Sequence, residues 1–373
     1  MANRLCASLS EIPDALRKTG FVLEHQVAEA FKSAGWSIIG GRFYADDVDG
    51  RARELDLIAY KSFKHNDLSV VYSVLVSCKK DSENTWAFLT RDKPANDPNF
   101  DWEPIHYWTD VNPLEKYLQS EKWKEAYFSD LKNSWSDLSA KRDVFAFQQI
   151  NSKKVVPQND TAVFSSITTL MKGLDYELVA LPQRQKNKGR IYFFSLLSVV
   201  DAPLVEVRYS GREAEALAVE TDGLTHFARY MVRKREMAAL IRFVRSDVLA
   251  DEIGRMDRLA KGTARYAASM VKASFGAIKT NASVQAYFAD RLQARLGWWL
   301  GYRLRQLRVQ HDVVKLNGVN YKDGMLKLEL DYLDEKSLEV LNTDSEVLDL
   351  TRNTLRQIAR YDGDFVFDLD IPF

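Results

Sequence analysis

The sequence predicts an α/β protein: a mixed sheet flanked by helices, followed by a mainly helical C-terminal domain. Near the N-terminus, a helical pattern precedes three strand-like runs, and the third run is apolar on both faces, as in a sheet covered on both sides. Beyond about residue 225, arginines alternate with apolar residues in a way that we interpret as amphipathic helices. With 373 residues and 46% apolar side chains, the chain is long enough for two domains with sizeable cores.

The expected N-terminal elements follow in order. Residues 21–34 place Phe21, Val27, Ala28 and Phe31 near one helical stripe, and Gly35 ends the helix. Three strands are then expected, in the runs WSIIGGRFYADD with a Gly-Gly turn, RELDLIAY, and LSVVYSVLVS.

The later elements set the expected domain division. Residues 82–183 are expected to be mostly helical, and strands to resume in YELVALPQ, RIYFFSLLSVV and PLVEVRYSG. Residues 225–310 are expected to form helices, before a strand in MLKLELDYL and a helix in SEVLDLTRNTLRQIARY. We therefore predict a first domain over 1–215, with a helical insertion at about 85–175, and a second over 216–373 that is basic and then acidic.

Charge is unevenly distributed, although 52 basic and 52 acidic side chains cancel over the whole chain. Residues 184–308 carry 23 basic and 12 acidic side chains, whereas residues 309–373 carry 7 and 14. The basic segment is compatible either with a solvated amphipathic face or with a surface that follows phosphates. The two cysteines, Cys6 and Cys78, have no metal-ligand or disulfide spacing, and no run is apolar enough to span a membrane, so we expect a cytoplasmic protein.

Two neighbouring strands carry the residues that suggest chemistry. Because residues i and i+2 of a strand share a face, Glu54 and Asp56 point the same way, and so do Ser77 and Lys79. If the strands are neighbours, these side chains converge at one end of the sheet, and Glu24 of the first helix lies over that end.

The order of these elements resembles the restriction-endonuclease-like PD-(D/E)XK nuclease superfamily: a helix with a glutamate, a Gly-Trp turn, a strand with ELDLI, and an apolar strand ending in CKK. The resemblance covers about residues 20–90 closely and continues more weakly to about 210. It implies a Mg²⁺- or Mn²⁺-dependent enzyme that hydrolyses nucleic-acid phosphodiester bonds. By the same resemblance, Asp56 would bind the metal, Lys79 would position or deprotonate the attacking water, and Glu24 rather than Glu29 would support the site.

The sequence departs from the family pattern at Ser77, where an acidic metal ligand is expected. Serine is a neutral and weak ligand for a hard cation. Either another carboxylate replaces it, from Glu54, Asp81 or Glu83, or the site no longer cuts.

The predicted function follows from these alternatives. The first is a metal-dependent nuclease, in prokaryotic restriction, repair or antiphage defence, with Asp56, Glu54 and Glu24 at the metal and Lys79 and Ser77 beside it. The alternative is an inactive nuclease-like protein that binds nucleic acid, another copy of itself or a partner protein. In either case we expect a nucleic acid, DNA in the first instance, to be bound by four basic residues: Lys80, Arg233, Lys234 and Arg235.

Overall fold

The computed structural model describes residues 11–17, 19–65, 68–94, 101–120, 123–136, 138–185, 189–210, 215–309, 314–331 and 333–369. The chain forms two compact units. The first consists of Met1–Asp110 and Phe128–Arg265, and the second of Val111–Tyr127 and Tyr266–Phe373. The boundary expected at 215/216 falls at the start of β10 (Glu215–Glu220), within the first unit.

The first unit is built around a mixed sheet with the strand order β1-β2-β3-β8-β12-β11, and β5 pairs along part of β8. The strands are β1 (Ser37–Ala45), β2 (Ala52–His65), β3 (Leu68–Lys80), β5 (His106–Thr109), β8 (Arg190–Asp201), β11 (Gly223–Val232) and β12 (Arg235–Arg245). β2 runs antiparallel to β1 and β3, whereas β8 runs parallel to β3 and β12. The predicted mixed α/β class is confirmed, and the nearly continuous burial of β3 matches its apolar sequence.

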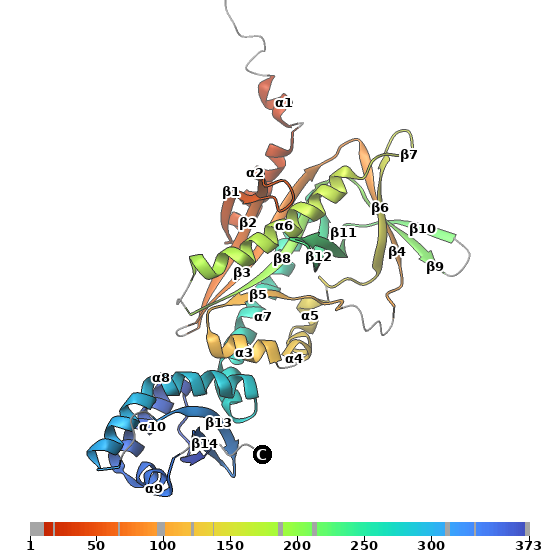
Figure 1. Cartoon of the computed structure of the whole chain (residues 1–373). Coiled ribbons are helices and arrows are strands. Elements are labelled where there is room, and N and C mark those ends of the chain that lie inside the picture. Colours follow the sequence, from red (N-terminus) through yellow and green to blue (C-terminus); the bar gives the residue numbers. More distant parts are fainter. Residues whose placement is uncertain are drawn as a thin grey trace, which may run out of the picture. The chain divides into compact units, whose positions relative to one another are not determined.

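Helices cover both faces of this sheet. α2 (Gly20–Ser33) buries Leu23, Val27 and Phe31 against it, while Phe21 of the predicted stripe is exposed. α6 (Thr161–Arg184) crosses the opposite face, as Figure 1 shows. At Gly173 of α6 an added Cβ would lie 3.5 Å from Leu55, an ordinary packing distance, so the helix backbone there lies close to the side chains of the sheet.

A second sheet in the same unit has the order β10-β9-β4-β6-β7. Besides β10, its strands are β4 (Asn84–Arg91), β6 (Asp143–Asn151), β7 (Val156–Pro157) and β9 (Leu204–Ser210). The two sheets meet at aromatic side chains: the rings of Trp86 and Phe88 lie 6.2 Å and 4.9 Å from the ring of Phe243 in β12. These residues belong to one hydrophobic core with the inner face of α6.

The helix predicted at residues 225–245 is wrong, because β11 and β12 form a hairpin there. The strand signal was present: Ala239, Ile241 and Phe243 are buried at a spacing of two. The turn signal was not, since Arg233 and Lys234 make the turn with φ of 48° and 62°, a conformation more typical of Gly or Asn.

Two further secondary-structure expectations are corrected. Residues 85–175 include β4, β5, β6 and β7, so this segment is not simply helical. The run YELVALPQ is the last part of α6 rather than a strand, and Pro182 lies in the final turn of the helix. The apolar residues of this run belong to a helix that packs on the sheet. A short apolar run in the sequence is compatible with either a buried helix or a buried strand.

The other helices up to the end of α7 are mostly short. They are α1 (Ile12–Arg17), α3 (Asn112–Ser120), α4 (Trp123–Asp130), α5 (Lys132–Trp135) and η1 (Ser246–Val248), followed by the long helix α7 (Leu249–Gly276). α7 begins in the first unit and ends in the second.

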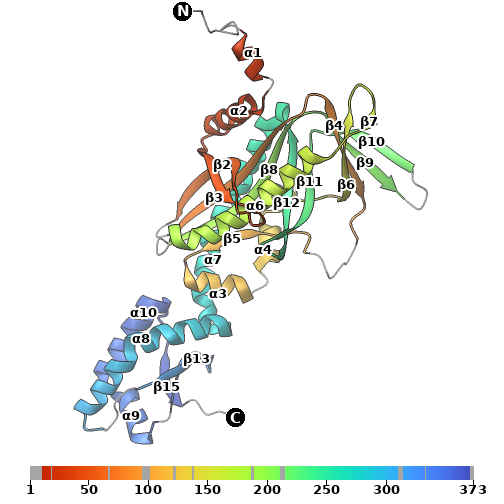
Figure 2. The ribbon, with the colours of Figure 1, turned by 45° about the horizontal axis from the view of Figure 1, so that its top comes forward.

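The second unit has a core of its own, formed by α8 and a small sheet (Figure 2). Its elements after α7 are η2 (Ala277–Lys279), α8 (Ala282–Gln306), β13 (Leu316–Lys322), β14 (Met325–Leu330), α9 (Glu335–Thr343), α10 (Ser345–Ala359) and β15 (Phe365–Leu369). The strand and helix expected in this region are confirmed as β14 and α10. Arg303 of α8 pairs with Asp344 at 2.9 Å, so part of the basic segment is held by the acidic C-terminal segment. Within the described residues, no helix is long and apolar enough to cross a membrane.

Candidate functional site at the end of β2 and β3

Asp56 lies where the pairing of β2 with β3 stops. The last ladder pair is Leu57 with Val76. Beyond it, the backbone N–H of Cys78 donates a 2.6 Å hydrogen bond to Oδ2 of Asp56 instead of continuing the ladder. Lys79 Nζ lies 4.0 Å from the same oxygen, and both side chains are largely buried. The aspartate is therefore fixed by the backbone of β3 and faces the lysine that follows.

Glu24 of α2 shares this environment. Partial burial raises the pKa of its carboxyl, and repulsion from Asp56 and then Glu54 raises it further, whereas Lys79 lowers it. Asp56, Glu54 and Lys79 therefore each lie within electrostatic reach of the Glu24 carboxyl. Glu29, the competing residue of the same helix, is paired with Lys32 on the exposed side.

Ser77 is fully buried between the sheet and α6. Its backbone is in register with Ser198 of β8, whose Oγ accepts a 2.8 Å hydrogen bond from Ser166 of α6. The Ser77 hydroxyl itself has no hydrogen-bond partner in the part of the chain that the structure describes. The residue at the expected acidic position is therefore neutral and enclosed.

Asp81 does not replace the missing acid. Its carboxylate accepts hydrogen bonds from Asn84 at 2.8 Å, from the Trp86 indole at 2.9 Å and from the Gln149 amide. These donors tie the end of β3 to the second sheet, which accounts for the carboxylate as a structural group. Glu83 is exposed, and Glu54 is the one of the three proposed substitutes that interacts electrostatically with Glu24.

The carboxylates do not form a ready-made metal cage. Over the described ranges, no three His, Cys, Asp or Glu side chains are grouped closely enough to hold a metal ion. Glu24, Glu54 and Asp56 nonetheless offer oxygen, the donor that Mg²⁺ prefers, and Mg²⁺ commonly keeps several waters and uses only one or two protein carboxylates. The residues therefore fit a hydrated ion held at Asp56 with Glu24 or Glu54.

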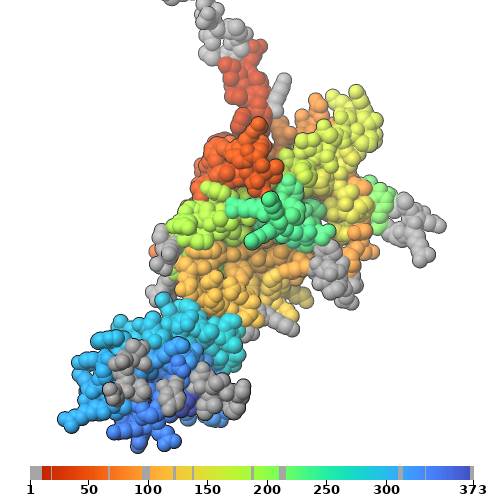
Figure 3. Space-filling model, in the orientation of Figure 1, coloured from red at the N-terminus to blue at the C-terminus, as the bar shows by residue number. Residues whose placement is uncertain are grey.

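The predicted nucleic-acid-binding residues lie in two places. Lys80 is next to the candidate site, and its Nζ is 3.0 Å from Asp201 at the end of β8. Arg233 and Lys234 form the turn between β11 and β12, and Arg235 begins β12. There Arg233 pairs with Asp175 of α6 at 2.7 Å. In Figure 3 the green segment that contains this hairpin reaches the surface of the first unit. The structure does not bring this turn together with Lys80.

Sequence reasoning missed the basic residues at the other end of β12. Lys79 is in register with Val200, and Val200 with Arg245, so the three form one row across neighbouring parallel strands. Two strand spacings separate Lys79 from Arg245, about 10 Å of backbone. The sequence pattern predicts an amphipathic helix at Arg245, and the row becomes apparent only once this segment is known to be a strand.

Comparisons with known proteins give no match: none among protein-family models, none among curated proteins and none among solved structures. Function must therefore be inferred from the side chains at the ends of these strands.

Proposed function

We propose that the chain is a metal-dependent nuclease of the PD-(D/E)XK type that hydrolyses phosphodiester bonds in nucleic acid, DNA in the first instance. The observation that carries this proposal is the convergence of Glu24, Glu54 and Asp56 with Lys79 at the end of β2 and β3. The order of the elements around these residues agrees with the proposal: α2 precedes the antiparallel strands β1, β2 and β3, and after an insertion from β4 to β7 the chain forms α6 and then β8, which is parallel to β3.

Each residue has a role that its surroundings support. Asp56, fixed by the Cys78 N–H, is the residue best placed to hold a cation. Burial raises the pKa of Glu24 first, and repulsion from Asp56 and Glu54 raises it further; a cation would relieve that repulsion. Lys79 would position or deprotonate the attacking water. A bound Mg²⁺ or Mn²⁺ would supply charge neutralisation at the phosphoryl oxygens.

Cleavage of plasmid and of labelled oligonucleotides in Mg²⁺ or Mn²⁺ tests this proposal. Lys79→Ala and Asp56→Asn are each expected to lower the rate by about a hundredfold or more, the usual size of the effect of an acid–base group. The matched control is Lys64→Ala, because Lys64 is an exposed lysine of β2 outside the site. Cleavage that survives both site substitutions would refute the assignment of these residues.

A second candidate function is favoured by one observation, the burial of neutral Ser77 at the acidic position. In this case the chain binds nucleic acid or a partner on a nuclease-like fold without cutting. Binding of DNA by a protein that shows no cleavage in either metal, with a Kd that Lys79→Ala leaves unchanged, would support this function over the first. The pathway, in prokaryotic restriction, repair or antiphage defence, and a cytoplasmic location belong to the same proposal.

A further inference from the structure

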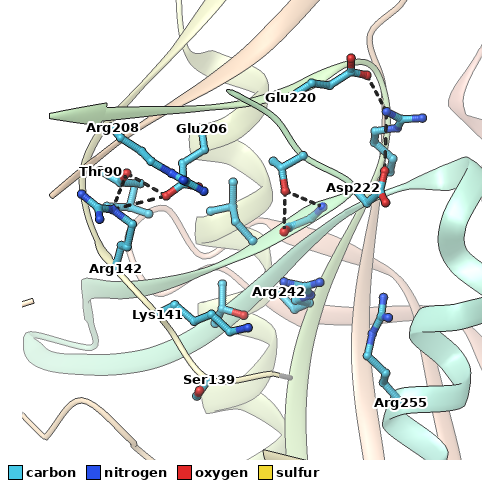
Figure 4. Close-up of a pocket in the computed structure, with 16 residues that line it drawn as sticks. Thr90, Ser139, Lys141, Arg142, Glu206, Arg208, Glu220, Asp222, Arg242 and Arg255 are labelled. Carbon is cyan, nitrogen blue, oxygen red and sulfur yellow. Dashed lines mark hydrogen bonds and ion pairs between the residues drawn. The ribbon is translucent and has the colours of Figure 1, made fainter. Parts of the chain in front are cut away.

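A pocket of about 740 Å³ opens in the first unit at the end of β12, between the two sheets and the start of α7 (Figure 4). None of the residues assigned above to the nuclease site lines it. Its lining includes six basic side chains, from Lys141, Arg142, Arg208, Arg242, Arg245 and Arg255. Three acidic side chains, from Glu206, Glu220 and Asp222, also line it.

The acidic lining residues already pair with arginines, in two separate clusters of the pocket. Glu206 pairs with Arg208 at 2.8 Å and with Arg142 at 3.5 Å. Arg245 is surrounded by carboxylates, with Glu220 at 2.7 Å and Asp222 at 3.8 Å. An anion would gain little at these arginines, because they already have carboxylate partners.

A third group of lining residues carries excess positive charge. Arg242 and Arg255 share a single carboxylate, that of Glu252, which is fully buried behind them at 3.2 Å and 2.8 Å. Lys141 is exposed and forms no ion pair with any residue that the structure describes. This group therefore has three positive charges and one negative charge, and in Figure 4 Lys141, Arg242 and Arg255 all lie below Glu206 and Glu220.

Gly223 leaves room for the guanidinium of Arg242. A Cβ on it would lie 2.6 Å from the carbonyl oxygen of Phe243 and 3.1 Å from a terminal nitrogen of Arg242. The glycine thus allows the guanidinium to lie against the backbone of β11, where Glu252 fixes it. A preformed arrangement of this kind loses little side-chain entropy when it binds a ligand.

We propose that this group of Lys141, Arg242 and Arg255 binds a phosphate group, carried either by a nucleotide or by the end of a nucleic-acid strand. A terminal phosphate is close to dianionic at neutral pH and accepts several hydrogen bonds, which matches two guanidinium groups and one ammonium with a net charge of +2. This site is additional to the proposed nuclease function and does not depend on it.

Isothermal titration at constant ionic strength in chloride tests the proposal with four probes: inorganic phosphate, AMP, a 5′-phosphorylated oligonucleotide and its 5′-hydroxyl twin. Lys141→Gln is expected to weaken binding of the phosphate-bearing probes about tenfold, the loss of one charge-assisted contact. Because Lys141 is exposed and has no ion pair with described residues, this variant should fold normally. Lys154→Gln, at an exposed lysine of the same sheet region, is the matched control and should leave binding unchanged.

The probes distinguish the two sources of the phosphate. Binding of AMP as tight as that of the 5′-phosphorylated strand indicates a nucleotide site. A Lys141-dependent preference for the phosphorylated strand over its hydroxyl twin and over AMP indicates a strand-end site. The proposal is overturned if no probe binds, or if Lys141→Gln and Lys154→Gln bind alike.

Two further variants separate this site from the nuclease site. Arg255→Gln is expected to weaken phosphate binding. Arg242 can still pair with Glu252 in this variant, so the fold should persist, and thermal unfolding checks this. Lys79→Ala is expected to leave phosphate binding unchanged whatever it does to cleavage. Failure of the pocket therefore shows in titration, and failure of the nuclease proposal shows in cleavage.

Discussion

The carboxylate of Asp56 takes the place of a backbone acceptor for the N–H of Cys78, at 2.6 Å, where the ladder between β2 and β3 ends. This bond gives the residue a structural role that is separate from any chemistry. It also fixes the backbone of Cys78, the residue before Lys79. Lys79 Nζ consequently lies 4.0 Å from Oδ2 of Asp56.

Asp56→Ala is therefore expected to destabilise the fold as well as abolish the site. Removing the acceptor leaves a partly buried N–H without its partner, which costs about 1–3 kcal/mol of unfolding free energy. Asp56→Asn retains an acceptor oxygen and should cost less. Urea unfolding of both variants measures the difference, and equal stability of the two would mean that the bond to Cys78 contributes nothing.

Glu24 should make stability depend on pH in an unusual direction for a carboxylate. Its pKa in the folded state is raised above its ordinary 4.5, first by burial. The folded state then binds more protons than the unfolded state, so stability is lost as the pH rises from 4.5 through the raised pKa. Glu24→Gln should therefore be more stable than the wild type at pH 7, and the gain should vanish below 4.5.

The control for this experiment lies on the same helix. A hydrogen bond with Lys32 lowers the pKa of Glu29, so its contribution is present above 4.5 and lost as the pH falls through the lowered pKa. Glu29→Gln should consequently be less stable than the wild type at pH 7, the opposite sign. Urea midpoints of the two variants and the wild type at pH 7 and pH 4 test these expectations. If both substitutions change the stability at pH 7 in the same direction, the environment assigned to Glu24 is wrong.

Much of the sheet could be predicted, because most of its strands have a clear local sequence pattern. The first helix, β1, β2, β3, β8 and β9 were all expected, since long apolar runs between Gly and polar turns leave few alternatives. The β11–β12 hairpin was not, because its Arg-Lys turn lacks the usual Gly or Asn and its arginines alternate with apolar residues in a way that also suits a helix.

The candidate site could be predicted only as far as strand order allowed. Spacing within a strand indicated that Glu54 and Asp56 share a face, and the order of the elements suggested Lys79 and Glu24. What Asp81 does could not be predicted, because its partners Trp86 and Gln149 come from the second sheet. The proposed phosphate-binding residues could not be predicted either, since tertiary packing alone places Lys141 and Arg255 in the lining of the same pocket.

Gly223 should tolerate no side chain, in contrast to another glycine nearby in the sequence. Gly223→Ala places a Cβ 2.6 Å from the carbonyl oxygen of Phe243, a backbone atom that cannot move easily, so we expect a loss of about 1–3 kcal/mol. At Gly254 of α7 the nearest atom to a Cβ is 3.9 Å away, and Gly254→Ala should stabilise the helix by about 0.5–1 kcal/mol. Thermal unfolding measures both, and a neutral Gly223→Ala would show that β11 can shift away from Arg242.

Ser77 and Ser166 offer a matched pair, because both are fully buried serines on facing elements, yet only Ser166 has a hydroxyl partner among the described residues. Ser166→Ala breaks the 2.8 Å bond to Ser198 and should cost about 1 kcal/mol of unfolding free energy. Ser77→Ala removes a buried hydroxyl that makes no such bond, so it should be neutral or stabilising by up to about 1 kcal/mol.

Ser77→Glu buries a charge beside Lys79 and should be strongly destabilised without metal. If Mg²⁺ restores its stability and raises cleavage above the wild type, the serine marks a site that has lost one ligand; if Mg²⁺ changes neither, position 77 is not where a metal ligand belongs.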